Sequence, residues 1–437
     1  MIHRIVIELI IVIVLSDLYI DMHYFHKHYH IKWWQRVLWW APCVMMIVYT
    51  CVLASIENFA PADLTWLNLY MLLLGLFVGP KAIFTVFSSV GWVLRKTIIP
   101  THRNYGHYLG LLAGLIAVGA YIYGLTIGVG QIRVSHVDIS FPDLPTQFDG
   151  YRIVHVSDIH LGTFNGWRKK ILVDEMDSIR AQRADIICFT GDLQNMRPQE
   201  VAVMVPVLTT AMDGRRIPVL AVLGNHDYAE YVKHTPLIEE NMRRELIAIE
   251  SNRLHWRVLN NAHLSVRRPQ PGIGPQTEHG GAAASVRQPA DSIVFVGTEN
   301  DGRPPFPQRA DWPKAFRGVS GSAFVIVLQH DPSAWERTIL PKTNAQLTLS
   351  GHTHGGQCQF LGHRPTQLTQ HEDCGLYHRG GRYLYVNAGL GGLVPFRLNM
   401  PNEITVITLH SAAKVSRSHT ATATPLSGHN TRSPHYK

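Results

Sequence analysis

Four long apolar segments near the start of the chain limit most strongly what it can fold into. They cover residues 5–20, 38–56, 66–90 and 108–129. Their lengths suit helices that cross a hydrocarbon layer about 30 Å thick. The first segment is short and carries Glu8 and Asp17; a cleaved signal peptide is its alternative, but no small-residue cleavage site follows it. We therefore predict a helical region over residues 1–135 with about four transmembrane helices.

The basic residues around these segments predict an orientation. They lie between segments one and two and between segments three and four, namely Lys27, Lys32, Arg36, Arg95, Lys96 and Arg103. The loop between segments two and three has Glu57 and Asp63 and no basic residue. Because cytoplasmic loops carry an excess of Lys and Arg, four spans would leave everything after residue 129 on the outer face of the membrane.

The charge distribution argues against a nucleic-acid partner. Nine Lys and Arg against five Asp and Glu in residues 1–135, and four against none in residues 411–437, account for the whole formal net charge of +8. Residues 136–410 are therefore electrically balanced. A nucleic-acid-binding domain needs a basic surface, so we expect no nucleic acid as partner.

Residues 136–410 have the pattern of an α/β domain. Short apolar runs at 151–157, 185–190 and 218–223 alternate with helical spacing at 167–182. Further strands are expected at 323–329, 346–350, 383–387 and 404–409. This order predicts a partly parallel sheet that packs against a second sheet, with helices outside. A Pro, Gly and Gln-rich stretch at 265–291 is predicted to be a low-complexity insertion, and 411–437 a disordered tail.

Polar clusters follow the predicted strands. They read SDIHLG, TGDL, GNHD, LQHDP and SGHTHGGQ along the chain. Each cluster alone is typical of a turn or of a buried side chain. However, the carboxyl ends of strands in an open α/β sheet lie at one edge, so all five clusters are expected to converge there.

The donor types in these clusters favour a metal site. Carboxylate and imidazole donors without a thiolate suit divalent Mn, Fe or Zn, and one shared Asp is enough to bridge two ions. Two ions about 3.5–4 Å apart activate a bridging water and clamp phosphoryl oxygens. The pattern therefore predicts two divalent metal ions and hydrolysis of a phosphate ester.

The order DxH, GD, GNHD, a later single His and GHTHGG resembles the calcineurin-like metallophosphoesterase superfamily. The forms SDIHLG and GHTHGGQ resemble its bacterial membrane-associated branch. The resemblance covers residues 136–410 and implies a four-layer α/β-β/α sandwich. It implies that one ion is held by Asp158, His160, Asp192 and His354, with Asp192 bridging, and that the second is completed by Asn225, His330 and His352. It also implies that His226 lies beside the substrate phosphate as a catalytic residue, and that Asp227 orients it.

The stretch that begins NAGLGG resembles the closing segment of the same branch. There Arg397 would contact the substrate phosphate, and a surface salt bridge is its alternative. The apolar run at 393–396 either receives an acyl chain or belongs to the core. Cys358 and Cys374 either pair in an oxidising compartment or remain free thiols.

These observations predict a membrane-anchored two-metal phosphohydrolase. It would cleave a phosphate mono- or diester by attack of a hydroxide that bridges the ions, with a phospholipid or another lipid-linked phosphate as a candidate substrate. Its expected place is the bacterial inner membrane, with the catalytic domain on the outer or periplasmic face. One alternative is a UDP-diacylglucosamine pyrophosphohydrolase of lipid A synthesis, which requires a cytoplasmic catalytic face. Another is a non-catalytic membrane receptor that keeps the fold, which would lack a ligand. GxSxG, GxxxxGK[ST] and CxxC motifs are absent, so a serine hydrolase, a P-loop enzyme and a thiol redox protein have no support.

Overall fold

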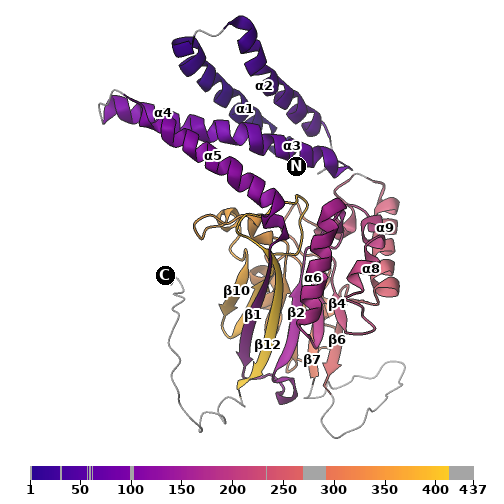
Figure 1. Ribbon diagram of the computed structural model, residues 1–437. Helices are drawn as coiled ribbons and strands as arrows, with labels where there is room; N and C mark the ends of the chain where they lie inside the picture. Colours follow the sequence, from indigo (N-terminus) through magenta and orange to yellow (C-terminus); the bar gives the residue numbers. More distant parts are fainter. Residues whose placement is uncertain are drawn as a thin grey trace.

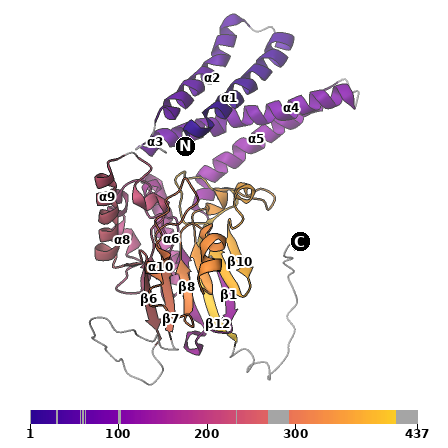
Figure 2. The same cartoon turned by 180° about the vertical axis from the view of Figure 1, so that it is seen from behind.

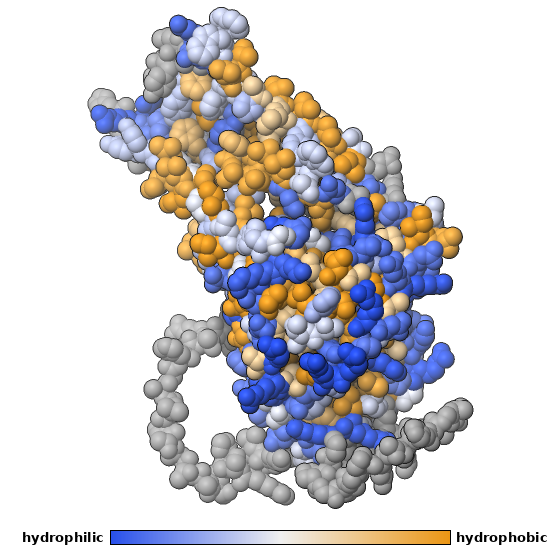
Figure 3. All heavy atoms as spheres, turned by 45° about the vertical axis from the view of Figure 1, so that its right-hand side comes forward, coloured by the Kyte–Doolittle hydropathy of each residue, from blue (hydrophilic) through white to orange (hydrophobic). Residues whose placement is uncertain are grey.

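The computed structural model describes residues 2–29, 32–56, 58, 61, 63–98, 103–232, 234–268 and 292–412. A group of long helices stands on one end of a body built from two β-sheets (Figure 1). Hydrophobic side chains gather over the helices, and hydrophilic ones cover much of the body (Figure 3). This division follows the composition of the sequence, since the apolar segments lie before residue 130.

Besides the predicted helices, the helical region contains short 3-10 and π-helical turns. Its elements are η1 (Ile2–Ile5), α1 (Val6–Ile20), η2 (Asp21–Tyr29), α2 (Trp33–Ala54), α3 (Leu64–Leu73), η3 (Leu74–Val78), α4 (Gly79–Thr97) and α5 (Tyr105–Thr126). Within the described part of the chain, three helical stretches are long and apolar enough to cross a membrane: Trp33–Ala54, Leu64–Thr97 and Tyr105–Gly130. The first predicted segment forms α1, whose 15 residues make it shorter than these three.

Asp17, an acidic residue in the first predicted segment, forms an ion pair in the structure. Both carboxylate oxygens of Asp17 lie 2.7 Å from Nζ of Lys81, on α4. Asp17 is buried, with 1% of its surface exposed. Charged groups among membrane helices are normally paired in this way, so α1 packs inside the helical region.

Two six-stranded mixed sheets form the body. The first has the order β1-β12-β2-β3-β4-β5 and the second β10-β11-β9-β8-β7-β6. The strands of the first are β1 (Ile132–Phe141), β2 (Tyr151–Val156), β3 (Ile186–Phe189), β4 (Val219–Ala221), β5 (Arg257–Val258) and β12 (Asn402–Ser411). Those of the second are β6 (Ala262–Arg267), β7 (Ser292–Gly297), β8 (Phe324–Leu328), β9 (Leu347–Ser350), β10 (Gly375–Arg379) and β11 (Arg382–Val386). The strands β2 to β5 run parallel, as do β7, β8, β9 and β11.

Helices cover the outer face of each sheet, which confirms the predicted four-layer sandwich. They are α6 (Lys169–Ala181), α7 (Pro198–Ala202), α8 (Val205–Leu208), α9 (Pro236–Ala248), α10 (Trp312–Ala315) and α11 (Leu340–Lys342). Short 3-10 or π turns join them: η4 (Gly128–Gly130), η5 (Thr146–Phe148), η6 (Leu161–Thr163), η7 (Gly166–Arg168), η8 (Asn225–Tyr228), η9 (Ile249–Arg253), η10 (Trp335–Ile339), η11 (His354–Gln357) and η12 (Pro365–Leu368). Figure 2 shows the side on which α10 lies.

Three apolar clusters hold the layers together. Along β7, Ile293 and Phe295 face the cluster between the two sheets, while Val294 and Val296 face the cluster beneath Trp335. A third cluster joins the first sheet to α6 and its neighbours. Strands buried on both faces read as unbroken apolar runs, which is why the sequence located the central strands well.

The borders of the body differ slightly from those expected. The strand β1 begins at Ile132, inside the region assigned to the membrane helices, and pairs with β12 over its whole length. The start of the expected insertion belongs to β6, and its residues 269–291 lie outside the described part. The expected tail lies outside it from residue 413 onwards. Cys358 and Cys374 carry free thiols.

Candidate metal centre

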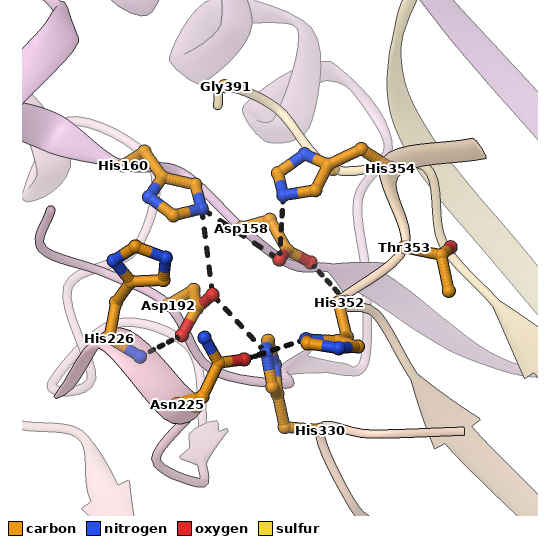
Figure 4. A network of polar contacts seen from close by, with 12 residues as sticks. Asp158, His160, Asp192, Asn225, His226, His330, His352, Thr353, His354 and Gly391 are labelled. Carbon is orange, nitrogen blue, oxygen red and sulfur yellow. Dashed lines mark hydrogen bonds and ion pairs between the residues drawn. The ribbon is translucent and has the colours of Figure 1, made fainter. Parts of the chain in front are cut away.

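Seven side chains that the sequence placed at strand ends meet at one edge of the two sheets (Figure 4). The contributing strands are β2, β3 and β4 of the first sheet and β8 and β9 of the second. The seven residues are Asp158, His160, Asp192, Asn225, His330, His352 and His354. The expected convergence therefore occurs, and the cluster lies across both sheets.

Two groups of possible ligands lie within this cluster, and a third, His160, Asp192 and His226, overlaps it. Asp158, His160 and His354 form one and Asp192, His330 and His352 the other, and in each the ligand atoms lie within 4.8 Å of one another. Oδ1 of Asp158 is 3.3 Å from Nε2 of His354. Oδ2 of Asp192 is 3.3 Å from Nε2 of His330 and 3.6 Å from Nε2 of His160. Asp192 thus lies between the two groups.

Asn225 completes the second group. Its Oδ1 lies 2.9 Å from Nε2 of His330 and 2.6 Å from Nδ1 of His352. With Asp192, His330 and His352, the amide oxygen of Asn225 makes a fourth donor of the kind that a divalent ion takes.

The backbone is strained at most of these positions. Five of the seven residues have φ between 51° and 72°, a range that residues other than glycine rarely adopt: Asp158, His160, Asp192, His352 and His354. Each such conformation costs about 1–3 kcal/mol and persists only where its surroundings enforce it. Strain at neighbouring positions that all face one space is typical of a functional site.

Several polar atoms in the cluster lack a partner, and this tests whether the residues fit a metal ion. Oδ1 of Asp158 and both ring nitrogens of His160 are buried without a hydrogen bond in the described structure. Burying such atoms unpaired is costly. A cation next to the carboxylate and an imidazole nitrogen would satisfy them, so the residues fit a metal.

The electrostatics of the cluster also favour a cation. Burial lowers the pKa of His330, but the opposing carboxylates of Asp192 and Asp158 outweigh it and raise the value to about 10. Burial raises the pKa of Asp158 to about 6 and lowers that of His160 to about 3. The space between the two acids therefore attracts positive charge, which a divalent ion supplies directly.

Neighbouring groups orient the imidazole rings. Nδ1 of His330 lies 2.6 Å from the carbonyl oxygen of Thr190, so it is the protonated nitrogen and Nε2 faces the cluster. Nε2 of His352 lies 3.7 Å from a carboxylate oxygen of Asp331, which leaves Nδ1 to face Asn225. Such outer partners fix the ring tautomer at metal sites. Sequence reasoning missed Asp331, although it directly follows His330 in LQHDP.

His226 lies beside the cluster as expected, but the role expected of Asp227 is wrong. Nδ1 of His226 lies 2.8 Å from the carbonyl oxygen of Asn195. Asp227 instead accepts hydrogen bonds from the backbone N–H groups of Asp192, Leu193, Gln194 and Gly224. It therefore positions the loop that carries Asp192, and the carbonyl of Asn195 orients His226.

Tyr231 is a second residue that sequence reasoning missed. Its hydroxyl accepts a hydrogen bond of 2.6 Å from the side-chain amide of Asn225. Its ring packs on His226 with the centroids 4.2 Å apart. No motif marks this tyrosine, and only its contacts identify it.

The surface salt bridge expected as the alternative for Arg397 is wrong, and its contact with substrate phosphate stays a prediction. Its side chain is buried, with 1% exposed, and makes no surface salt bridge. The guanidinium donates to the carbonyl oxygens of Ala388, Gly389, Gly391, Met400 and Pro401. Through these bonds Arg397 holds together the loop after β11. That loop touches the site, since the N–H of Gly391 donates to the carbonyl of Asp158 at 2.8 Å.

The rim of the cluster packs against the membrane helices. Met196, Tyr231 and Leu393 belong to the apolar cluster formed mainly by α1, α2 and α3. Phe396 lies on Tyr121 of α5 with ring centroids 5.3 Å apart. A Cβ at Gly124 would lie 2.4 Å from the Phe396 ring, so this glycine allows the close approach. The run at 393–396 is thus contact surface between the body and the helices.

Two family models match the chain. A calcineurin-like phosphoesterase transmembrane domain, described as probable, matches residues 3–129, and calcineurin-like phosphoesterase matches residues 151–356. The chain is 28% identical over 315 residues to the metallophosphoesterase YkuE of Bacillus subtilis, which covers 70% of this chain and 96% of the relative. It is 28% identical over 308 residues to a transmembrane protein with metallophosphoesterase domain of Danio rerio, covering 69% of this chain and 63% of the relative. It is 27% identical over 330 residues to UDP-2,3-diacylglucosamine pyrophosphatase LpxG of Chlamydia trachomatis, covering 68% of this chain and 97% of the relative.

Proposed function

Because this chain belongs to the calcineurin-like phosphoesterases, and is a metal-dependent phosphoesterase with a transmembrane domain, we propose that it hydrolyses a phosphoester carried by a membrane lipid. The family and the metal centre account for phosphoester hydrolysis. The contact between the metal centre and the membrane helices supports a lipid as the carrier of the phosphoester.

One observation carries the proposal. Tyr231 contacts both Asn225 and His226 of the centre, and it also belongs to the apolar cluster of the membrane helices. A single side chain, that of Tyr231, therefore joins the metal centre to the helical region. A phosphate that reaches it from the membrane surface stays close to the lipid that carries it.

The residues of the centre divide the work of hydrolysis in this proposal. Two divalent ions held by the two groups of ligands would neutralise phosphoryl charge and activate water. Asp192 would contribute to both groups because its carboxylate faces His160 and His330.

His226 would act as the proton donor. The carbonyl of Asn195 holds Nδ1 as the protonated nitrogen, so Nε2 can bind a proton and, in the imidazolium form, pass it to the leaving oxygen. Asp227 would keep the loop of Asp192 in register with this ring through its four backbone hydrogen bonds.

We place the body on the outer face of the membrane. The end of α1 that leads to α2 and the end of α4 that leads to α5, near which basic residues gather in the sequence, point away from the body, whereas the C-terminal end of α2 lies next to it (Figure 1). Basic junctions stay in the cytoplasm. Alkaline phosphatase fused after Val129 should be active and a fusion at Arg95 inactive; the opposite pattern would overturn this orientation.

A second candidate substrate is UDP-diacylglucosamine. The 27% identity to LpxG, which covers 97% of that relative, favours it. This substrate would need the body on the cytoplasmic face, so the fusion experiment also separates the two candidates.

The test of the function uses purified full-length protein in lipid nanodiscs. Phosphatidic acid, a generic phosphodiester and UDP-diacylglucosamine would be offered with Mn²⁺ and with a chelator. We expect hydrolysis that the chelator abolishes, and Asp192→Asn should lose both bound metal and turnover. The matched control is Asp138→Asn, since Asp138 lies on β1 with 71% of its side chain exposed. Turnover in chelator, or unchanged turnover of Asp192→Asn, would contradict the proposal.

A further inference from the structure

A lateral groove lies among the membrane helices next to the body. It is formed by one face of α1, by the α3–η3–α4 helix and by α5, and it holds about 850 Å³ of space, its open mouth included. Its walls include Leu9, Val12, Leu74, Gly75, Val78 and Tyr121. Among its lining residues only Glu8 is charged.

The floor of the groove is held in shape by specific contacts. A Cβ at Gly75 would lie 2.3 Å from the ring of Tyr121, so the absence of a side chain there makes room for the tyrosine. The Tyr121 hydroxyl donates to the carbonyl of Met71 at 2.8 Å. Gly75 lies in η3, a π-helical turn, and such turns are frequent at functional positions.

Packed side chains link the walls of the groove to the metal centre. Its Tyr121 wall stacks on Phe396, in the loop whose Gly391 N–H binds the carbonyl of Asp158. On the other side, Leu9 and Leu74 share an apolar cluster with Tyr231, which packs on His226. Two independent sets of contacts therefore lead from the groove to the cluster of ligands.

We propose that this groove holds a hydrocarbon chain of the substrate while the phosphoester of the same molecule lies at the metal centre. The inference rests on the proposed function and adds the site for the lipid chain. A chain gains little by leaving one apolar surrounding for another, so the groove acts mainly by alignment. It directs the chain along α1 and so brings the phosphate to the ligands.

The test fills the groove with a larger side chain. Ile5, in η1, and Val12, on α1, line the groove and are 44% and 43% exposed, so Ile5→Trp and Val12→Trp place larger side chains at its wall. Val48→Trp is the matched control, because Val48 is 56% exposed on α2 and does not line the groove.

The probes are 4-nitrophenyl alkyl phosphodiesters and alkyl phosphate monoesters, each from methyl to octyl, offered to the Mn²⁺-loaded full chain in nanodiscs. Partition of each probe into the bilayer is the same for every variant, so the ratio of kcat/KM between variant and wild type isolates the groove. We expect both groove variants to lower this ratio by about tenfold or more for octyl probes and to leave methyl probes within about twofold. Val48→Trp should behave as wild type at every length.

Other outcomes would overturn the inference. These are an unchanged chain-length profile in both groove variants, an equal loss with methyl and octyl probes, or a wild type without chain-length preference. The thermal unfolding midpoint of each variant shows whether an equal loss comes from misfolding. If the wild type hydrolyses none of the probes in a chelator-sensitive way, the proposed function itself fails, and that result differs from a failure of the groove alone.

Discussion

The side-chain amide of Asn225 donates to the hydroxyl of Tyr231 at 2.6 Å, and this bond turns its oxygen toward His330 and His352. An Asn side chain can present either end to a metal, but only the oxygen is a ligand. Tyr231 therefore selects the productive orientation of Asn225, although it lies outside every motif.

Removing the Tyr231 hydroxyl should weaken the centre without dismantling it. We expect Tyr231→Phe to lower kcat by about fivefold, because one hydrogen bond of about 1 kcal/mol no longer orients Asn225. The measurement is steady-state hydrolysis together with the metal content of the purified protein. Tyr105→Phe is the control, since Tyr105 is 66% exposed on α5. An unchanged kcat would show that Asn225 is oriented by other groups.

Asp331 should affect metal binding through His352. In Asp331→Asn the ring of His352 loses the carboxylate 3.7 Å from its Nε2. Loss of such an outer partner weakens metal affinity by about 10–100-fold. Titration of the metal-free protein with Mn²⁺ measures this, and Asp174→Asn on the exposed face of α6 is the control. Equal affinities of wild type and Asp331→Asn would assign Asp331 a structural role only.

Arg397 should govern the stability of its loop. Arg397→Lys keeps the positive charge but cannot reach five carbonyl oxygens, so we expect a loss of about 3 kcal/mol of unfolding free energy. The denaturation midpoint and hydrogen exchange of the loop at 388–401 would report it. Unchanged stability of Arg397→Lys together with a raised KM would instead support contact between Arg397 and the substrate phosphate.

Glu250 should make stability depend on pH. It is fully buried in η9, and neither carboxylate oxygen has a hydrogen bond. Burial raises its pKa well above the usual value, with Asp227 adding to the effect. The folded protein therefore keeps the proton that the unfolded chain releases, so this residue lowers stability as pH rises above about 4.5.

Replacement of Glu250 by Gln removes that titration. Relative to wild type, we expect Glu250→Gln to raise the thermal unfolding midpoint more at pH 8 than at pH 5, with both proteins measured in one detergent. Glu239→Gln, on a partly exposed position of α9, is the control. A stabilisation that does not change with pH would show that Glu250 is ionised in the folded protein.

The convergence of the candidate ligands was predictable because strand order and local motif determine where they lie. Parallel strands bring their carboxyl ends to one edge, so a residue two to four positions after each strand must face its counterparts. The unbroken apolar runs of β3 and β8 marked those strands clearly. The membrane segments were equally visible from length and composition.

The partners of individual side chains were decided by the tertiary structure alone. Asp227 and His226 are adjacent in the chain, yet they bind different backbone groups. The donors of Arg397 meet carbonyls of its own loop, and Phe396 fits against α5 only because Gly124 lies opposite. Periodicity and composition act over a few neighbouring residues, so the sequence by itself indicated the membrane helices, seven of the twelve strands that the structure describes and the polar clusters that follow them. Hydrogen-bond partners and close contacts depend on how loops and distant segments pack, and these meet only when the sheets, the loops and the membrane helices have come together.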